Sequence, residues 1–386
     1  MIIGGGVIGS AAAGFLRQAR AAPEVVVLEP DPTYARAASP RACGGVRRLF
    51  SCPENVAMSR YTHQVLGCWR QFVGGASDAQ APDLGWTQNG YLFIRDDGAA
   101  RSTVASLGEQ PVQENDVRWL TPAEVKDRFP LIRADDLAGA VFSPADGWLD
   151  PSSFLMGLRA RARRLGASFV AEQVAGFEAT ARQVTGVHLA SGRHLKAHTV
   201  INAAGCWAPG LAAQLGWKLP VEPMRRFVHY AETPAGLEGL PFVKDPAHLG
   251  ARPVGVGLEA GVVDYAEPAG FNFSLDGAAG HFQNRVWPAL AHRFPALDRL
   301  RLKSSWTGLY DQNRFDGNMI IGSQPGGIGN FHLACGFSGH GLMHSPAVGR
   351  ALAELVLHGE YRTIDLSRLS GQRVTDGRPY PERGIV

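Results

Sequence analysis

The sequence predicts an α/β fold, α+β overall, in which a Rossmann-like nucleotide-binding domain is joined to a second domain built on an antiparallel sheet. Two observations support this. The chain opens on a glycine-rich strand, turn and helix followed by a second strand, which is the start of a βαβ unit. Two later stretches leave this pattern and are rich in aromatic and alternating apolar residues, as half-buried antiparallel strands are. We assign residues 1–75, 145–214 and 303–386 to the nucleotide-binding domain, and 76–144 and 215–302 to the second domain.

The opening stretch, IIGGGVIGSAAAGFLRQARAAPEVVVLE, carries the spacing G-x-G-x-x-G. Gly4 permits the tight strand-to-helix turn, Gly6 lets the backbone approach a pyrophosphate, and Gly9 allows close packing of helix on strand. A helix that starts near Val7 directs its free N–H groups and its dipole at that pyrophosphate. Glu29 follows Gly9 by 20 residues, where a carboxylate accepts hydrogen bonds from ribose hydroxyls. The chain has 47 glycines in all, but in this βαβ context we interpret these three as a dinucleotide site rather than a simple turn.

Composition argues against several classes of protein. The chain of 386 residues is 45% hydrophobic, enough for a buried core, and its net charge of +3 comes from 38 basic and 35 acidic residues without long runs. A nucleic-acid-binding surface is therefore not expected, and no apolar run reaches the roughly 18 residues of a membrane span. The opening lacks the basic region of a signal peptide, which predicts a cytoplasmic protein. Its very short first strand, residues 1–3, suggests that the natural chain begins upstream.

No metal site is predicted. The five cysteines are odd in number and contain no C-x-x-C pair, which argues against a disulfide framework or a zinc site. His340 and His344 have the H-x-x-x-H spacing of a metal pair on a helix. However, Gly339, Gly341 and Pro346 favour a loop there, and no third ligand is near in the sequence.

Local signals at the ends of segments predict the remaining helices and strands. Ser51 and Glu54 have the spacing of a capping box, and Asn89-Gly90 is typical of a turn between two strands in residues 85–98. Helices are predicted over residues 53–72, from Thr121 to Phe129, from Asp150 to Gly166 and from Ser345 with Pro346 to Gly359, and strands near Phe169, Phe177 and Val187 and over 199–203.

A loop of small residues, 37–46, follows the strand that carries Glu29. In a doubly wound sheet such a loop lies at the carboxyl edge, beside the ligand. Arg47 and Arg48 come directly after it. Two interpretations of this pair stay open: a surface salt bridge or phosphate contact, and a role in holding a substrate carboxylate.

Several segments together resemble one family of flavoproteins, which includes D-amino-acid oxidase, glycine oxidase and sarcosine oxidase. The segments are GGGVIGSA with Glu29, CGGVRRLFSCPENVAMS, DGWLDPSSFL, VINAAGCWAP, PVEPMRRFV and, as the most specific, GFSGHGLMHSPAVGRALAELVLHG. They cover nearly the whole chain in the family's order and are most similar to the sarcosine-oxidase-like branch. The resemblance implies an FAD-dependent oxidoreductase whose Rossmann-like domain binds FAD.

The resemblance also implies which residues hold FAD. The ADP half would be held by Gly4, Gly6, Val7, Ile8, Gly9 and Glu29, with Val174 beside the adenine. The flavin would be lined by Ser39, Cys43, Gly44, Gly45, Val46, Ala204, Gly205, Trp207 and Gly308, and by Gly336, Ser338, Gly339, His340, Gly341, Leu342 and Met343. Backbone N–H groups of the last segment, together with His340, would lie where negative charge develops as the flavin is reduced, and preorganised donors there lower the barrier.

The chain departs from the family at several positions. Some relatives bind flavin through a cysteine in the segment that corresponds to Trp306–Tyr310, which here has none, so the FAD is expected to be non-covalent. The lysine that sarcosine oxidases use toward oxygen is absent from Arg252–Phe273, which leaves the electron acceptor open. Met343 and Phe50 stand where a relative has a lysine and an arginine for the substrate carboxylate. The candidates that remain for this carboxylate are Arg47, Arg48, Arg225 and Arg226.

We predict an enzyme that oxidises the C–N bond of an amino acid, with a secondary (N-alkyl) amino acid favoured over a primary one. The amine loses its proton, a hydride passes from the carbon next to nitrogen to flavin N5, and the imine that results hydrolyses. A carboxylate clamp at Arg47 or Arg48 would align the C–H bond with N5. Tyr265 and His229, on strands of the predicted antiparallel sheet, and His340 are candidates for the pocket. Aromatic side chains on such strands also serve packing.

Two other functions stay open. A dehydrogenase of similar substrates would pass its electrons to a quinone or a carrier protein instead of oxygen, and would reduce a dye without forming peroxide. A flavin-binding assembly factor without turnover would hold FAD that no amine reduces.

Overall fold

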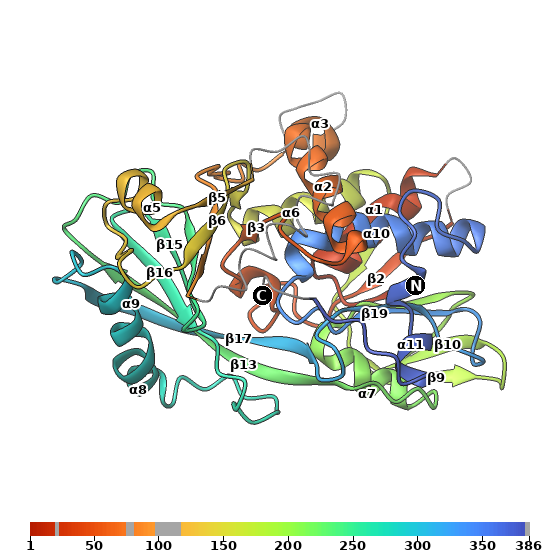
Figure 1. Cartoon of the computed structure of the whole chain (residues 1–386). Coiled ribbons are helices and arrows are strands. Elements are labelled where there is room, and N and C mark those ends of the chain that lie inside the picture. The colour runs from red at the N-terminus through yellow and green to blue at the C-terminus, as the bar shows by residue number, and fades with distance from the viewer. Residues whose placement is uncertain (20–22, 75–80, 97–116, 383–386) are drawn as a thin grey trace.

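The computed structural model describes residues 1–19, 23–74, 81–96 and 117–382. Figure 1 shows two lobes, one holding the six-stranded sheet near the N-terminus and one holding an eight-stranded sheet, with the long strands β13 and β17 running from one lobe to the other. In the part of the chain that the structure describes, no helix is long and apolar enough to cross a membrane.

The six-stranded sheet forms the core of the lobe near the N-terminus. Its order is β18-β19-β12-β1-β2-β8, and every neighbouring pair is parallel except β18 and β19. The strands are β1 (Ile2–Ile3), β2 (Val26–Leu28), β8 (Ser168–Val170), β12 (Val200–Asn202), β18 (Ile320–Ser323) and β19 (Phe331–Cys335). Helix α1 packs against both α6 and α10 (Figure 1); their bounds are Val7–Gln18, Pro151–Arg164 and Gly341–His358. The parallel pairing of β1 with β2 through α1 confirms the predicted βαβ start.

Two glycines determine how closely these layers approach. A Cβ atom on Gly9 would lie 1.9 Å from the carbonyl oxygen of Gly4. A Cβ atom on Gly349 in α10 would lie 2.5 Å from the Cβ of Ala11 in α1. Any side chain at either position would overlap its neighbour, so the close packing of α1 on the first turn and of α10 on α1 requires glycine. The packing role predicted for Gly9 is confirmed.

The eight-stranded sheet forms the core of the second lobe. Its order is β17-β13-β16-β15-β14-β4-β6-β5, and the pairs are antiparallel apart from β14 with β4. The strands are β4 (Tyr91–Arg95), β5 (Arg118–Leu120), β6 (Gly139–Ser143), β13 (Val221–Glu232), β14 (Phe242–Lys244), β15 (Leu249–Val254), β16 (Gly257–Val262) and β17 (Arg301–Asn313). The domain boundary predicted at residue 303 falls inside β17, so we propose to move it to the end of that strand.

The two faces of the eight-stranded sheet carry different side chains. One face is apolar and packs against α5 (Pro122–Arg128), α8 (Ala278–His281) and α9 (Trp287–Arg293). Side chains alternate between faces along each strand, so the other face carries a different set. Tyr91 and Phe242 on that other face pack with Cys43, which belongs to the glycine-rich loop after β2. The second face is therefore turned toward the nucleotide-binding domain.

Smaller elements complete the fold. Strands β9 (Val174–Ala179), β10 (Val184–Leu189) and β11 (His194–Lys196) form a three-stranded sheet, and β3 (Gly45–Val46) pairs with β7 (Gly147–Trp148). The other helices are α2 (Pro53–Gly67), α3 (Trp69–Gly74), α7 (Ala208–Ala213) and α11 (Gln372–Thr375), with 3₁₀ turns at Ser39–Arg41, Gly205–Trp207 and Ser367–Leu369 and a π-helical turn at Phe282–Val286.

Three predicted helix ends are confirmed. Thr121 and Glu124 form the reciprocal capping box of α5. The carboxylate of Asp150 accepts the N–H of Ser153 at 2.6 Å and caps α6. Gly359 ends α10 with a φ of 75°, a left-handed conformation that glycine adopts at no steric cost.

The capping box predicted at Ser51 and Glu54 is wrong. Cys52 is the N-cap of α2, and the carboxylate of Glu382, near the end of the chain, takes the capping role. Glu382 accepts the N–H and the hydroxyl of Ser51, both at 2.6 Å, and the N–H of Cys52 at 3.1 Å. A carboxylate is stabilised at a helix N-terminus by the free N–H groups and the dipole, so a distant residue competes successfully with the local one. Helix α2 also ends earlier than predicted, and α3 follows it.

The hairpin predicted at Asn89-Gly90 is also wrong. Thr87 forms a single bridge with Trp148, while β4 pairs with β6 and β14. Gly90 has a φ of 84°, and a Cβ atom there would lie 2.6 Å from the ring of Phe142. The glycine therefore serves a close approach between segments rather than a two-residue turn; residues 97 and 98 lie outside the described part of the chain.

Helix α10 begins at Gly341, one turn before the start predicted at Ser345 and Pro346. A proline inside a helix leaves one carbonyl without its N–H donor, here the carbonyl of Leu342. The hydroxyl of Ser345 donates to that carbonyl at 2.9 Å. This hydrogen bond replaces the missing one, which explains why the helix continues through the proline.

The sequence suggested that His229 lines the substrate pocket. The structure places it instead on the apolar face of the eight-stranded sheet. It is fully buried, and its Nδ1 lies 2.8 Å from the hydroxyl of Ser305 while its Nε2 lies 2.9 Å from Nδ1 of His281. His281 Nε2 lies 3.1 Å from the carbonyl oxygen of Val262. Burial lowers the pKa of both rings, so both are neutral. With neutral rings only one assignment satisfies every atom: Ser305 donates to His229, His229 to His281, and His281 to the carbonyl.

This histidine pair should make stability depend on pH. Burial lowers the pKa of His229 to about 4 and also lowers that of His281. The unfolded chain therefore binds more protons between about pH 4 and 6.5, and the free energy of unfolding falls as the pH drops through that window. We expect His229→Gln, which keeps a donor and an acceptor, to remove about 2 kcal/mol of the loss between pH 7.5 and 5 in urea unfolding. The exposed His188→Gln is the control; an equal pH dependence in wild type and His229→Gln would contradict the expectation.

Candidate active site

The N-terminus of α1 lies beside Glu29 and Ser39. The carboxylate of Glu29 accepts the N–H of Gly5 at 2.8 Å, and the hydroxyl of Ser39 accepts the N–H of Val7 at 3.4 Å. Gly6 is the N-cap of α1 and has no side-chain cap, and the nearest atom to a Cβ placed there is the Ser39 hydroxyl at 3.6 Å. With glycine at the N-cap and only a long contact from Ser39 to one N–H group, this helix N-terminus fits a pyrophosphate.

Glu29 keeps capacity for a further ligand. Its second oxygen accepts the N–H of Asp31 at 3.1 Å, so each carboxylate oxygen has one backbone partner and room for another. Burial raises its pKa, and the two N–H groups act in the opposite direction. The side chain thus suits ribose hydroxyls, which donate hydrogen bonds.

The loop before Arg47 is fixed by contacts to both domains. Gly44 has a φ of 72°, and a Cβ atom there would lie 1.9 Å from the carbonyl oxygen of Leu149. A Cβ atom on Gly45 would lie 1.8 Å from the hydroxyl of Tyr91 on β4. These glycines let the loop press against β7 on one side and the eight-stranded sheet on the other, so Cys43 and Val46 are held at the junction of the two domains.

Strand β17 holds the second glycine-rich loop, residues 336–341, in front of α10. The carboxylate of Asp311 accepts the N–H of Gly336 at 2.8 Å, and the hydroxyl of Ser338 accepts the N–H of Asn313 at 3.0 Å. Burial raises the pKa of Asp311 to about 6, although backbone N–H groups oppose the shift. A Cβ atom on Gly339 would lie 2.6 Å from the ring of Tyr310. This loop precedes Gly341, Leu342 and Met343, which form the first turn of α10.

The other residues predicted to hold the cofactor lie around these two loops. Ala204 follows β12 and lies against Gly4, where a Cβ would be 3.0 Å from its Cα. Gly205 has a φ of 53° and no heavy atom within 4 Å of an added Cβ, which leaves room beside it. Trp207 is 39% exposed and stacks on Phe271 with centroids 5.5 Å apart. Val174, at the start of β9, is buried.

The four candidate arginines differ in what neutralises them. Arg48 lies 2.9 Å from the buried carboxylate of Asp146, and Arg225 lies 2.7 Å from Glu267. Both of these arginines thus serve structural ion pairs. Arg47 is buried against the ring of Phe50, with its guanidinium carbon 4.0 Å from the centroid, and donates to the carbonyl oxygen of Leu49 and to His340.

Arg226 has no carboxylate partner among the described residues. It is 7% exposed, and its guanidinium lies between the rings of Tyr310 and Tyr265, 5.0 and 5.5 Å from their centroids. Its guanidinium donates to the carbonyl oxygens of Arg225 and Asp264 and, at 3.5 Å, to the side-chain oxygen of Gln312, while its Nε has no hydrogen-bond partner. Arg226 therefore retains donors for an anion, although burial lowers its pKa. Tyr265 itself is 49% exposed, at the rim of this cluster.

Arg226 lies on the sheet face that is turned toward the nucleotide-binding domain. It pairs in register with Gly308 of β17, and a Cβ atom on Gly308 would lie 3.3 Å from the Cβ of Arg41. Arg41 belongs to the loop that begins with Ser39. The face beside Arg226 thus approaches the same loop that lies at the N-terminus of α1.

His340 is oriented by Arg47. Its Nε2 lies 3.2 Å from the guanidinium, which can only donate, so Nε2 accepts and the ring proton is on Nδ1. Burial lowers the pKa of His340 well below its ordinary value, and the charge of Arg47 lowers it further. His344 instead lies 3.1 Å from the hydroxyl of Ser59. Among the described residues, no three His, Cys, Asp or Glu side chains gather as metal ligands would.

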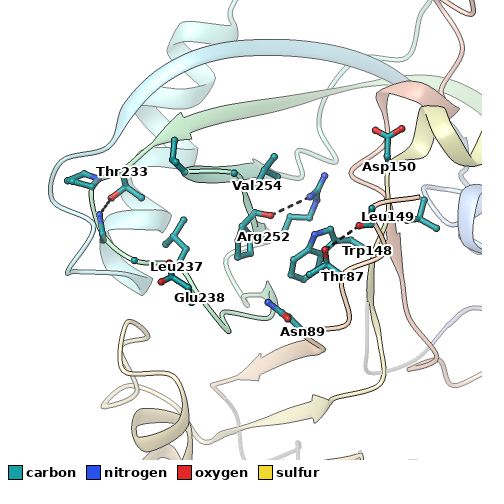
Figure 2. A pocket seen from close by; sticks show the side chains of 17 residues that line it. Thr87, Asn89, Trp148, Leu149, Asp150, Thr233, Leu237, Glu238, Arg252 and Val254 are labelled. Atoms are coloured by element: carbon teal, nitrogen blue, oxygen red, sulfur yellow. Dashed lines mark hydrogen bonds between the residues drawn. The ribbon is translucent and has the colours of Figure 1, made fainter. Parts of the chain in front are cut away.

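A cavity of about 850 Å³ opens at the outer end of the same sheet face. Figure 2 shows Trp148, Arg252 and Thr87 on its walls, with Leu237 and Glu238 on the opposite side. Arg252 is neutralised by Glu259 on β16, whose carboxylate lies 2.6 Å away. Trp148, on the cavity wall, pairs in register with Gly45 at the end of the loop that follows β2.

Sequence reasoning missed two charged side chains near the site. Asp311 lies in a strand whose neighbours, GLYDQN, gave no signal that its carboxylate would hold the loop 336–341. Lys244 on β14 lies outside the segment Arg252–Phe273 in which a lysine was sought, yet it belongs to the same sheet. The position of a strand within an eight-stranded sheet cannot be predicted from the spacing of residues along the chain.

The fold and the site define a two-domain oxidoreductase that binds a dinucleotide cofactor. Residues 1–355 match the model of the family DAO, described as FAD dependent oxidoreductase, and the chain belongs to that family. FAD is its cofactor, and the open helix N-terminus with the available oxygens of Glu29 fits the pyrophosphate and ribose of that molecule.

Individual relatives agree with this assignment. The chain is 34% identical to FAD-dependent oxidoreductase domain-containing protein 1 of Xenopus laevis, over 100% of this chain and 84% of that protein. It is 30% identical to the mitochondrial sarcosine dehydrogenase of Homo sapiens, over 71% of this chain and 31% of that protein. The structure of L-proline dehydrogenase from P. horikoshii superposes with a TM-score of 0.86 at 25% identity and covers 98% of each chain. The predicted resemblance to this flavoprotein family is confirmed.

Proposed function

We propose that this FAD-dependent oxidoreductase oxidises the C–N bond of an amino acid, with a secondary (N-alkyl) amino acid favoured. Bound FAD would supply the acceptor for a hydride from the carbon next to nitrogen, and the imine would then hydrolyse. The protein's part is to bind the carboxylate, orient the C–H bond and exclude water. An amino-acid substrate agrees with the names of two relatives, sarcosine dehydrogenase and L-proline dehydrogenase.

The observation that carries this proposal is that Arg226, a buried arginine, has no carboxylate partner among the described residues. It lies on the sheet face that is turned toward the cofactor loops. Arg226 has unused donors between two tyrosine rings, whereas Arg48 and Arg225 are neutralised by carboxylates. A fork of guanidinium N–H groups suits a carboxylate. We propose Arg226 as the carboxylate anchor and Arg47 as the residue that keeps His340 neutral with its proton on Nδ1.

A dehydrogenase that passes electrons to a quinone or a carrier protein is the second candidate. Two of the relatives named above are dehydrogenases. In addition, Glu259 and Arg252 neutralise each other on the central strands of the sheet, and residues 252–273 contain no lysine. Peroxide formation in air, compared with reduction of a dye under nitrogen, separates this candidate from an oxidase.

The reaction class is tested by an anaerobic absorbance spectrum of the purified protein. We expect a flavin band that is bleached by at least one compound in a panel of N-methyl, cyclic and primary amino acids, because hydride transfer reduces the flavin. The carboxylic acids with the same carbon skeletons but no amino group serve as controls. A flavin band that no amine bleaches would contradict the proposal and would favour a flavin-binding assembly factor without turnover.

A further inference from the structure

Lys244 is a cation without a counter-ion on the sheet face that is turned toward the cofactor loops. Among the described residues, no carboxylate lies within ion-pair distance of its ammonium group and no acceptor forms a hydrogen bond with it; the ring of Phe242 lies 5.4 Å away. Burial lowers its pKa, nearby Cys43 opposes that shift, and the charge of Arg47 lowers the pKa further. Lys244 is half-buried, and shielding a cation from water without an anion is unfavourable, so an anionic ligand at this position would stabilise it.

The two strands next to Lys244 carry glycine at the positions beside it. Lys244 pairs in register with Gly250 on β15, and Gly250 pairs with Gly261 on β16. A Cβ atom on Gly250 would lie 3.3 Å from the ammonium nitrogen of Lys244, so the lysine side chain extends over its neighbouring strand toward the middle of the sheet. Neither glycine places a side chain on this face between Lys244 and β13.

Arg226 lies on the same face, on β13, which is the neighbour of β16 in the sheet. By the strand register Gly250 is level with Val228, so Arg226 lies two strand spacings, about 10 Å, across the sheet from Gly250 and a further two residues, about 7 Å, along β13. A single carboxylate cannot contact both cations over that separation. Arg252, another cation of this face, is already neutralised by Glu259 at 2.6 Å. Arg226 and Lys244 therefore offer two separate positions for anions on this face.

We infer that the substrate carries two anionic groups, with its α-carboxylate on Arg226 and a second carboxylate on Lys244. This inference rests on the proposed function and names its substrate class as an amino acid with an additional acidic group on its side chain or on its N-substituent. Lys244 would determine specificity rather than take part in the chemical step, because it contacts the part of the substrate that does not react.

The test uses the FAD-loaded protein and measures Kd from the shift of the flavin absorbance band on titration with non-reacting acids. Succinate and glutarate are compared with acetate and propionate. We expect the dicarboxylates to bind roughly 10- to 100-fold more tightly, and Lys244→Met to lose that preference while acetate binds as before. Lys244→Arg should restore part of the preference, and the exposed Lys218→Met is the matched control.

Equal affinities of wild-type protein for mono- and dicarboxylates, or a dicarboxylate preference that survives in Lys244→Met, would overturn the inference. Neither result depends on turnover. If the titration shows a Lys244-dependent preference but no amine bleaches the flavin, the proposed reaction fails while the anion site stands. If neutral amino acids bleach the flavin and the preference is missing, the reaction stands and the two-anion substrate fails.

Discussion

Gly9→Ala is expected to abolish retention of FAD and to lower the free energy of unfolding by about 3 kcal/mol. The added methyl group would lie 1.9 Å from the carbonyl oxygen of Gly4 and 3.2 Å from the side chain of Ile2. Both neighbours belong to the strand and turn that start the nucleotide-binding domain, so relief requires α1 to move away. That movement would displace the N–H groups that we propose bind the pyrophosphate. The ratio of flavin absorbance to protein absorbance after purification, together with urea unfolding, measures both effects.

Gly67→Ala is the matched control for this change. Gly67 is the last residue of α2, and no heavy atom lies within 4 Å of a Cβ placed there. We expect FAD content at the wild-type level and stability unchanged or raised by about 0.5 kcal/mol. A Gly9→Ala protein that retained FAD and unfolded at the same urea concentration as wild type would show that α1 can shift without loss of the site.

Arg226→Met should weaken binding of the substrate carboxylate by roughly 10- to 100-fold, with FAD retained. The arginine is buried between Tyr265 and Tyr310 and has donors without partners, so its charge-assisted hydrogen bonds to a carboxylate would be largely shielded from water. The Kd of acetate, measured through the flavin band, reports binding directly. The KM of any amine that bleaches the flavin should rise in parallel.

Arg47→Met is the comparison that gives this result its meaning. Arg47 is already bonded to Leu49 and His340, so its loss is expected to alter the spectrum and the pH dependence of the flavin more than the affinity for acetate. If acetate affinity is unchanged in Arg226→Met and lost in Arg47→Met, the carboxylate anchor is Arg47. Partial recovery in Arg226→Lys would support a role for charge rather than for packing between the two rings.

Much of the nucleotide-binding half could be predicted because its signals are local. The glycine spacing, the strand that ends before Glu29 and the caps at Thr121 and Asp150 each act over a few neighbouring residues. The same holds for Gly359, where one left-handed residue ends a helix. Such features depend on backbone sterics and on the unpaired N–H and C=O groups at helix ends, which are the same in every fold.

The predictions that failed depended on a distant partner. Glu382 caps α2 from the far end of the chain, and the ring of Phe142 explains Gly90 better than a turn does. Pro346 is tolerated inside α10 because the hydroxyl of Ser345 supplies the missing donor, a detail that helix-start statistics do not contain. In each case the local preference is worth about 1 kcal/mol, which one tertiary hydrogen bond or ring contact can outweigh.

By itself, the sequence determined that this is an FAD-dependent oxidoreductase, as the family match confirms, and predicted Glu29 beside the first turn of α1, where the structure has it. Only the tertiary structure separated Arg225 from Arg226, which are adjacent in the chain but face opposite sides of β13, one paired with Glu267 and the other without a carboxylate. It also brought Lys244 to the same face as Arg226. The physical reason is that the partners of a buried cation, and therefore its role, depend on which groups the sheet register places around it. The register is set by contacts between strands that are far apart in the sequence.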